Sequence, residues 1–360
     1  MNDIGIYIHV PYCRVACPYC DFVKKATRGD APAAFVGALC REIGAFDGPD
    51  LAGSVFFGGG TPSLLAPKAL ASIIAALHGR FTVSDPEISV EVNPDDVTAE
   101  RLDAWVSVGV TRVNLGVQSF DDRVLKYFGR CHNSDDARRA CEAVAERFEN
   151  WGIDLIFGGK PHDAWRATLD DCLRFAPPHV STYNLTFEEG TPFWKRRAEA
   201  IDDDIGLELY REGDAALSLY DHYEVSNFAK PGFECRHNLI YWRNGEYAGF
   251  GPGAYSYLDG VRARNAPDID GYLRAPGAKS ESLRLTDREI KVETLIQHFR
   301  TRRGLPRADY IARFGAAPEA EFAAPLAALA ARELIEDDGD TLRPTRTGYE
   351  LNNEIGLAIV

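Results

Sequence analysis

Basic residues are scarce in this sequence: 40 Lys and Arg stand against 54 Asp and Glu, which gives a net charge of −14 over 360 residues. A protein that binds nucleic-acid backbones in general needs a basic face that neutralises phosphates. The deficit therefore argues against nucleic acid as a partner, although it leaves room for a local basic pocket.

Long apolar runs are also missing. The apolar stretches at 71–77 and 322–331 are much shorter than the roughly 20 residues that a membrane-spanning helix needs. A strand is already predicted at residues 4–10, so the basic and apolar regions of a secretion signal have no place before it. We expect a cytoplasmic protein without an integral membrane segment.

The rest of the composition, 45% hydrophobic and 26% charged, is typical of a globular protein. In the first two thirds, short β-branched runs alternate with Ala-, Leu- and Glu-rich stretches of helical period. Six such strand–helix units favour parallel strands with right-handed crossovers. We expect an α/β fold, a partial (β/α)6 barrel, with its chemistry at the carboxyl ends of the strands. The predicted strands are 4–10, 54–57, 88–92, 112–117, 153–157 and 180–184, and the predicted helices are 31–46, 67–77, 98–108, 134–148, 163–175 and 202–220.

The amino-acid composition changes after residue 222. Glycine and aromatic residues dominate 228–258, and a charged helical tail follows a Pro/Gly segment at 275–277. We predict a barrel core at 1–222, an aromatic and glycine-rich extension at 223–275, and a small helical, winged-helix-like domain at 276–360. Helices are expected at 318–332 and 347–359 in the last part.

Three cysteines, Cys13, Cys17 and Cys20, form a C-x3-C-x2-C loop directly after the first predicted strand. Structural zinc would need four ligands, and no fourth lies nearby. A redox pair would use only the second and third cysteines. The remaining interpretation is an iron–sulfur cluster on three thiolates, which leaves one iron open to a small molecule, and this is the interpretation we favour.

This loop resembles that of the radical S-adenosylmethionine (SAM) superfamily. The resemblance implies a [4Fe–4S] cluster on Cys13, Cys17 and Cys20, with the open iron chelated by the amino and carboxylate groups of SAM. Tyr19, just before the last cysteine, also fits the superfamily pattern. If SAM is cleaved, the reduced cluster passes one electron to the sulfonium and a 5′-deoxyadenosyl radical is released.

Polar residues at the other strand ends fit a site for SAM. The triple glycine 58–60 lets the backbone approach a ligand closely, and in the superfamily this position contacts the methionyl amino group. Glu91 offers a carboxylate to ribose hydroxyls, and Arg130 offers a guanidinium fork to the SAM carboxylate. The predicted SAM contacts at these strand ends are Gly59, Gly60, Thr61, Glu91, Gln118, Arg130 and Asp154.

A series of motifs resembles the anaerobic coproporphyrinogen III oxidase-like group over nearly the whole chain: YIHVPYC, CPYCDF, GGGTPS, EVNP, LGVQSF, GRCH, DLIF, STYNL and GFGPGAYS. By this resemblance Tyr7 also lines the SAM site. The chain departs from the true oxidase because Phe22 stands where the oxidase has a fourth Cys, and because the arm before the first strand is absent. We therefore do not expect it to decarboxylate coproporphyrinogen. The loop 158–162 (GGKPH) also departs from the group's G-L-P-G-Q-T.

The segment from His237 to Trp242 reads H-N-x-x-Y-W, which resembles the signature of the heme chaperone (HemW-like) branch. In that branch the His is associated with heme, for which imidazole is a natural axial ligand and aromatic rings are natural neighbours. The resemblance implies heme on His237, Tyr241 and Trp242. From the residues alone, the alternative is a packed aromatic loop with the His hydrogen-bonded inside.

The resemblance predicts a heme chaperone that carries a [4Fe–4S] cluster and exchangeable SAM and passes heme to an acceptor protein. An electron donor would serve any reductive cleavage of SAM. The alternative is a radical SAM enzyme that acts on a small molecule, as a methyltransferase or an oxidase.

Overall fold

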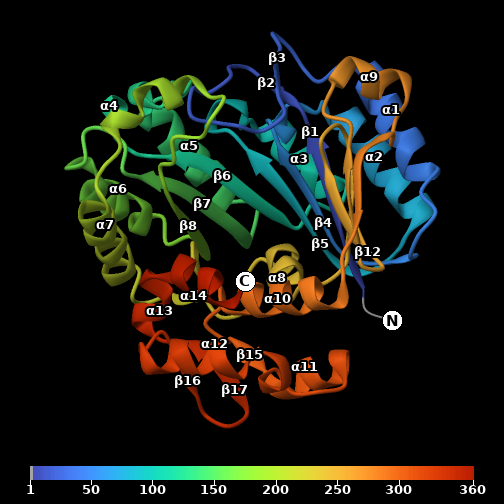
Figure 1. Ribbon diagram of the computed structural model, residues 1–360. Helices are drawn as coiled ribbons and strands as arrows, with labels where there is room; N and C mark the ends of the chain where they lie inside the picture. Colours follow the sequence, from blue (N-terminus) through green and yellow to red (C-terminus); the bar gives the residue numbers. More distant parts are fainter. Residues whose placement is uncertain (1–2) are drawn as a thin grey trace.

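The computed structural model describes residues 3–360, and six parallel strands form its centre (Figure 1). They pair in the order β1-β4-β5-β6-β7-β8. All six strands predicted from the sequence are present, several of them longer than predicted, and the partial α/β barrel is confirmed. The strands are β1 (Ile4–Val10), β4 (Leu51–Gly59), β5 (Thr82–Val92), β6 (Arg112–Gln118), β7 (Asn150–Phe157) and β8 (His179–Asn184).

Helices cover the outer face of these strands, as Figure 1 shows. Some of them begin at a side-chain cap: Thr98 accepts a hydrogen bond from the Arg101 N–H at the start of α3, and Asn133 and Asp136 form a capping box at the start of α5. The α-helices are α1 (Ala33–Gly44), α2 (Pro67–Arg80), α3 (Ala99–Ser107), α4 (Asp122–Tyr127), α5 (Ser134–Ala145), α6 (Ala164–Arg174) and α7 (Asp203–Ala216), and the 3-10 helices are η1 (Pro62–Leu64), η2 (Pro94–Asp96) and η3 (Pro192–Glu199).

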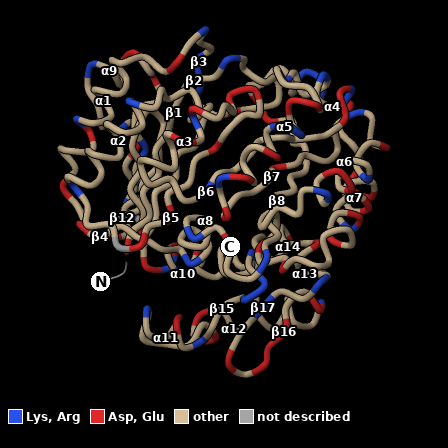
Figure 2. Tube along the Cα trace, turned by 180° about the vertical axis from the view of Figure 1, so that it is seen from behind, with Lys and Arg blue, Asp and Glu red and all other residues tan. Residues whose placement is uncertain are grey.

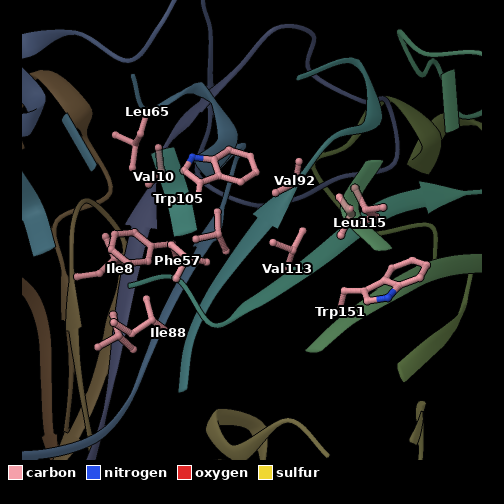
Figure 3. Close-up of a cluster of buried hydrophobic side chains, with 14 of the residues drawn as sticks. Ile8, Val10, Phe57, Leu65, Ile88, Val92, Trp105, Val113, Leu115 and Trp151 are labelled. Carbon is pink, nitrogen blue, oxygen red and sulfur yellow. The ribbon is translucent and has the colours of Figure 1, made fainter. Parts of the chain in front are cut away.

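The core lies between the sheet and this helical layer. Six of the seven residues of β1 are buried, because a parallel sheet with elements on both faces needs apolar residues in both directions. Figure 3 shows the side chains of Ile8, Phe57 and Trp105 meeting in this layer, and each is at most 1% exposed.

The sheet continues beyond the six central strands on both sides, which the sequence did not reveal. On one side, β11 (Tyr247–Phe250) runs parallel to β1, and three antiparallel strands follow. On the other side, two short antiparallel strands extend β8. The predicted divisions at 222 and 275 stay predictions. The added elements are β12 (Tyr255–Leu258), β13 (Val261–Asn265), α9 (Ile269–Arg274), β14 (Lys279–Arg284), β9 (Asp221–Glu224) and β10 (Asn227–Ala229).

The C-terminal part packs around a hydrophobic cluster of its own. It combines helices with a three-stranded antiparallel sheet of order β15-β17-β16, so the predicted helical domain is present. The expected last helix is divided at Leu351, whose backbone leaves the helical region. The elements are α10 (Asp287–His298), β15 (Leu305–Pro306), α11 (Arg307–Phe314), α12 (Glu319–Ala331), β16 (Ile335–Asp337), β17 (Thr341–Pro344), α13 (Arg346–Glu350) and α14 (Asn352–Ile359).

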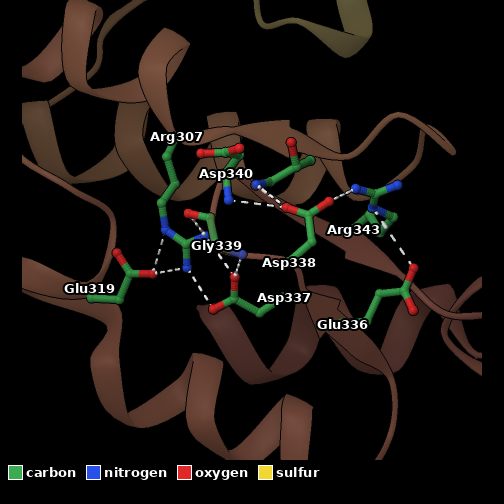
Figure 4. A network of polar contacts seen from close by, with 9 residues as sticks. Arg307, Glu319, Glu336, Asp337, Asp338, Gly339, Asp340 and Arg343 are labelled. Atoms are coloured by element: carbon green, nitrogen blue, oxygen red, sulfur yellow. Dashed lines mark hydrogen bonds and ion pairs between the residues drawn. The ribbon is translucent and has the colours of Figure 1, made fainter.

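An ion-pair network joins the small sheet to the helices around it (Figure 4). Arg307, at the start of α11, contacts Glu319 and also lies 2.7 Å from Asp337. Arg343 pairs with Asp338 in the neighbouring turn. Since most of these groups are partly exposed, the network contributes modestly to stability.

Charges of both signs are spread over the molecule, and Figure 2 shows basic positions around the short helix α8 (Arg236–Trp242). Over residues 3–360, none of the helices combines the length and the apolar character that crossing a bilayer requires.

Candidate functional site

A cavity of about 430 Å³ lies at the carboxyl ends of the central strands, beside the cysteine loop. We call it the cysteine cavity. Its position is the one expected for the chemistry of a parallel α/β barrel. It brings together most of the residues predicted from the sequence, namely Cys13, Cys17, Tyr19, Cys20, Gly59, Gly60, Thr61, Glu91, Gln118, Arg130 and Asp154.

The cysteine loop is tied down at both ends. Cys13 belongs to the short strand β2 (Tyr12–Cys13), which pairs with β3 (Lys25–Ala26), and the Cys20 N–H donates to the Cys17 carbonyl over 3.2 Å. All three thiols are free. Gly60 passes directly behind the loop: a Cβ there would lie 2.7 Å from the Val10 carbonyl oxygen and 3.0 Å from the Cys13 sulfur. Only glycine leaves room for the first sulfur.

The donor set fits an iron–sulfur cluster better than zinc. Among residues 3–360, no group of three or more His, Cys, Asp or Glu side chains gathers closely enough to hold a single metal ion. A cubane cluster is larger than one ion, so its ligand sulfurs stand further apart around one cavity. Burial raises the pKa of the Cys13 and Cys20 thiols, and bound iron would supply the positive charge that keeps them deprotonated.

Arg130 connects the cysteine loop to the strand ends. Its Nη1 donates to the Cys17 sulfur over 3.6 Å, and its Nη2 donates to Asn93 Oδ1 over 2.6 Å and to the Gly116 carbonyl over 2.8 Å. Its Nε is buried without a partner among the described residues. A buried guanidinium with an unused donor is suited to a ligand carboxylate. Asn93, which also donates to Thr61 Oγ1, belongs to this site as well; it lies in the EVNP motif but was not among the predicted SAM contacts.

Two carboxylates, one on β5 and one on β7, face the same cavity. Glu91 Oε2 accepts a hydrogen bond from the Gly59 N–H over 3.2 Å. Burial, followed by repulsion from Asp154, raises the pKa of Glu91 to about 8. Burial raises the pKa of Asp154 to about 6, against the effect of the Ser181 hydroxyl. Such acids are poised to accept hydrogen bonds from ligand hydroxyls, which would offset their desolvation.

Gln118 and Tyr19 complete the walls. Gln118 has a φ of 68°, in the left-handed region, and so turns the chain sharply at the end of β6. Tyr19 packs edge-on against Phe128 and Phe193, with ring centroids 5.5 and 6.2 Å apart. These rings hold the end of the cysteine loop against the barrel.

Tyr7 is not among the residues that line the cysteine cavity. Its hydroxyl lies 3.1 Å from His9 Nδ1, and its ring lies 3.1 Å from where a Cβ on Gly58 would be. Tyr7 therefore supports the floor of the site in this structure, and the prediction that it contacts SAM stays a prediction.

His237 lies deep inside the opposite end of the barrel, on α8. It is 1% exposed, and both ring nitrogens are engaged: Nδ1 lies 2.9 Å from Ser54 Oγ and Nε2 lies 2.8 Å from the Tyr241 hydroxyl. Burial lowers its pKa to about 3. This is the packed arrangement that we weighed against heme ligation. The heme role of His237 stays a prediction, and in this conformation neither nitrogen is available to iron.

The other two aromatic residues of the motif are only partly buried. The Tyr241 hydroxyl is hydrogen-bonded to His237. The Arg300 guanidinium carbon lies over the Trp242 ring, 4.9 Å from the centroid of that ring. The indole N–H has no partner among the described residues. The motif thus forms most of α8, which lies between the end of the barrel and the C-terminal part (Figure 1).

Comparisons with known proteins agree with this geometry. The chain matches the family model of the radical SAM superfamily over residues 7–172 and that of the HemN C-terminal domain over residues 285–351. The solved structure of coproporphyrinogen III oxidase (HemN) from Escherichia coli superposes with a TM-score of 0.85 over 99% of this chain and 90% of that chain, at 22% identity. At this identity, the superposition shows that the two proteins share a fold and shows no more than that.

Curated relatives are closer in sequence. The heme chaperone HemW of a Synechocystis species is 35% identical, covering 96% of this chain and 90% of the relative. HemW of Mycobacterium tuberculosis is 37% identical, covering 98% and 94%, and HemW of Escherichia coli is 34% identical, covering 88% and 87%. The chain therefore belongs to the radical SAM superfamily and, within it, to the HemW family.

Proposed function

We propose that this protein is a heme chaperone, which binds heme and passes it to an acceptor protein while it carries a [4Fe–4S] cluster and exchangeable SAM. The observation that carries the proposal is the likeness to proteins named heme chaperones along almost the whole of both chains, at 35% identity for the Synechocystis relative. The sequence identity to the oxidase is lower, at 22%, so the oxidase is the weaker guide to function.

The cysteine cavity supports the cofactor part of the proposal. Cys13, Cys17 and Cys20 would hold the cluster, and Arg130 with its free Nε would bind the SAM carboxylate. Glu91 would accept hydrogen bonds from the ribose. When bound, the reduced cluster supplies the electron that cleaves the sulfonium of SAM.

The cysteine loop supports a chaperone rather than a coproporphyrinogen oxidase. Phe22, at the oxidase's fourth Cys position, borders the cavity and is 59% exposed, so no thiol is supplied there.

The test uses the full chain, reconstituted anaerobically with iron and sulfide. Titration with ferric heme should give saturable binding near one heme per chain, followed by the heme absorption band. Mixing the loaded protein with the apo form of a b-type hemoprotein should transfer heme faster than free heme is taken up. Absence of saturable heme binding would refute the proposal.

The polar wall of the cysteine cavity beyond the predicted SAM contacts favours one second candidate. Tyr183, Asn184 and Glu188 line that wall and could face a small substrate, as in a radical SAM enzyme. Incubation with SAM and dithionite separates the two functions: S-adenosylhomocysteine or a methylated product would support a methyltransferase. 5′-Deoxyadenosine alone is compatible with the chaperone.

A further inference from the structure

A second and larger cavity lies at the other end of the barrel, between the amino ends of the strands and the C-terminal part. We call it the basal cavity. Its volume is about 1300 Å³, above the roughly 300–1,000 Å³ of common ligand sites, which is enough volume for a ligand as large as a tetrapyrrole. Its walls come from the starts of β4 and β5, the end of α8 with the residues after it, and helices α10 and α11, and include Ile240, Arg243, His298, Tyr310 and Arg313.

His298 is the imidazole in this wall, at the last residue of α10. Its Nδ1 lies 3.1 Å from the Gly304 carbonyl oxygen, and since a carbonyl only accepts, Nδ1 carries the proton. The neutral ring then presents its Nε2 lone pair, which no described residue hydrogen-bonds. Burial lowers the pKa of His298, so the ring is neutral near pH 7. A ring nitrogen fixed by a backbone carbonyl, with the other nitrogen free, is the usual arrangement of a metal-binding His.

Two guanidinium groups at the same cavity have no carboxylate partner. Neither Arg243 nor Arg313 forms an ion pair with any described Asp or Glu, although the chain carries 54 acids. Arg313 Nη1 instead donates to the Asn244 carbonyl over 2.9 Å. Asp309, the one acid near them in α11, lies 3.9 Å from Arg303. Four acids, Asp3, Asp50, Glu246 and Asp309, also border the cavity, and of these Asp50 pairs with Arg80. The two arginines, which have no such partner, suit the carboxylates of a ligand with a hydrophobic body.

Apolar contacts are available for that body. Pro49, Leu51, Ile240 and Ala312 border the cavity, and each is at least partly exposed. A smaller cavity of about 500 Å³ adjoins it and shares Arg243, His298 and Asp309. His298 therefore stands where the two spaces meet, within reach of a flat ligand that enters from either.

We propose that heme binds in the basal cavity, with His298 Nε2 as an axial ligand of the iron and Arg243 and Arg313 pairing with the propionates. This inference rests on the proposed heme chaperone function and places the cargo apart from the cysteine cavity. It gives the H-N-x-x-Y-W motif a supporting role. His237 anchors α8 to Ser54, while Ile240 on this helix and Arg243 directly after it border the basal cavity.

The first test compares His298→Ala with His78→Ala in the full, reconstituted chain. His78 is an exposed residue of α2, far along the sequence from the cavity lining, and serves as the matched control. Ferric heme is titrated and its ligation is followed by electron paramagnetic resonance. His298→Ala should weaken binding at least about tenfold, since even outer partners of a metal contribute that much, and should lose the histidine-ligated signal. Added imidazole should restore the signal.

A second test does not depend on how His298→Ala folds. The double variant Arg243→Gln/Arg313→Gln should bind heme about fivefold more weakly, as expected for partly exposed ion pairs, with its axial signal unchanged. With heme dimethyl ester, whose propionates carry no charge, the double variant and the parent should bind equally. An affinity difference that persists with the ester would contradict pairing with the propionates.

The outcomes separate this inference from the function on which it rests. If the parent chain binds no heme, the proposed function fails. If the parent binds heme, and His298→Ala keeps the histidine signal while His237→Ala loses it, the chaperone function stands and the placement at His298 is wrong. If His298→Ala loses the signal and imidazole restores it, the placement is supported.

Discussion

Replacing Gly60 by alanine tests whether the cysteine loop is built around a cluster. The added Cβ would lie 2.7 Å from the Val10 carbonyl oxygen, 2.8 Å from that of Tyr12 and 3.0 Å from the Cys13 sulfur. Ordinary contacts of this kind are 3.4–4 Å. Two of the three atoms are backbone oxygens of the segment that leads from β1 into Cys13, so that segment has to move. Overpacking of this kind costs about 1–3 kcal/mol.

The matched control is Gly79→Ala, near the end of α2. No atom lies within 4 Å of its added Cβ, and alanine favours a helix by about 1 kcal/mol over glycine. After anaerobic reconstitution, Gly60→Ala should stay folded by circular dichroism but hold less iron and sulfide per chain than Gly79→Ala. A Gly60→Ala protein with full cluster content and unchanged SAM affinity would show that our account of the loop is wrong.

Two further predictions concern buried charges. Burial and Asp154 raise the pKa of Glu91 from 4.5 to about 8, so the native state binds this proton more tightly than the unfolded state, and the unfolding free energy should fall as pH rises through this interval. Glu91→Gln should flatten the dependence of the unfolding free energy on pH, measured by urea titration of the apo protein between pH 5 and 9, and should also weaken SAM binding. If the unfolding free energy of the variant and of the parent changed equally with pH, the prediction would be wrong. Arg112 is fully buried, donates to Asn150 Oδ1 and lies 3.8 Å from Glu87. Arg112→Met should therefore destabilise the chain by about 3–5 kcal/mol, because a buried acid loses its partner, and a loss below 1 kcal/mol in the same titrations would refute this role.

The barrel was predictable because each central strand is a short apolar run followed by a stretch with the period of a helix. The strands β11 to β14 were not, because the sequence shows only short aromatic pieces divided by glycines between 247 and 265. Their place is set by pairing with β1, more than 200 residues away. No local pattern contains that information.

The SAM-site predictions rest on residues at strand ends, which the barrel brings to one edge, so most of them line one cavity. Tyr7 and His237 could not be placed in this way. Whether a side chain meets a ligand or a neighbour depends on contacts such as that between His237 and Ser54, which lie 183 residues apart. The role that we propose for His298 has no signal in the sequence, because a His in the last turn of a helix is ordinarily accounted for by the helix dipole.

The most direct test of the central claim is the iron and sulfide content of anaerobically prepared cysteine variants. Cys13→Ser, Cys17→Ser and Cys20→Ser should each lose most of the cluster. Cys131→Ser should keep about four irons and four sulfides per chain, because Cys131 is exposed and lies outside the cysteine cavity. If Cys131→Ser loses the cluster, or the three loop variants keep it, the chain does not hold an iron–sulfur cluster by three thiolates with one iron left open to SAM.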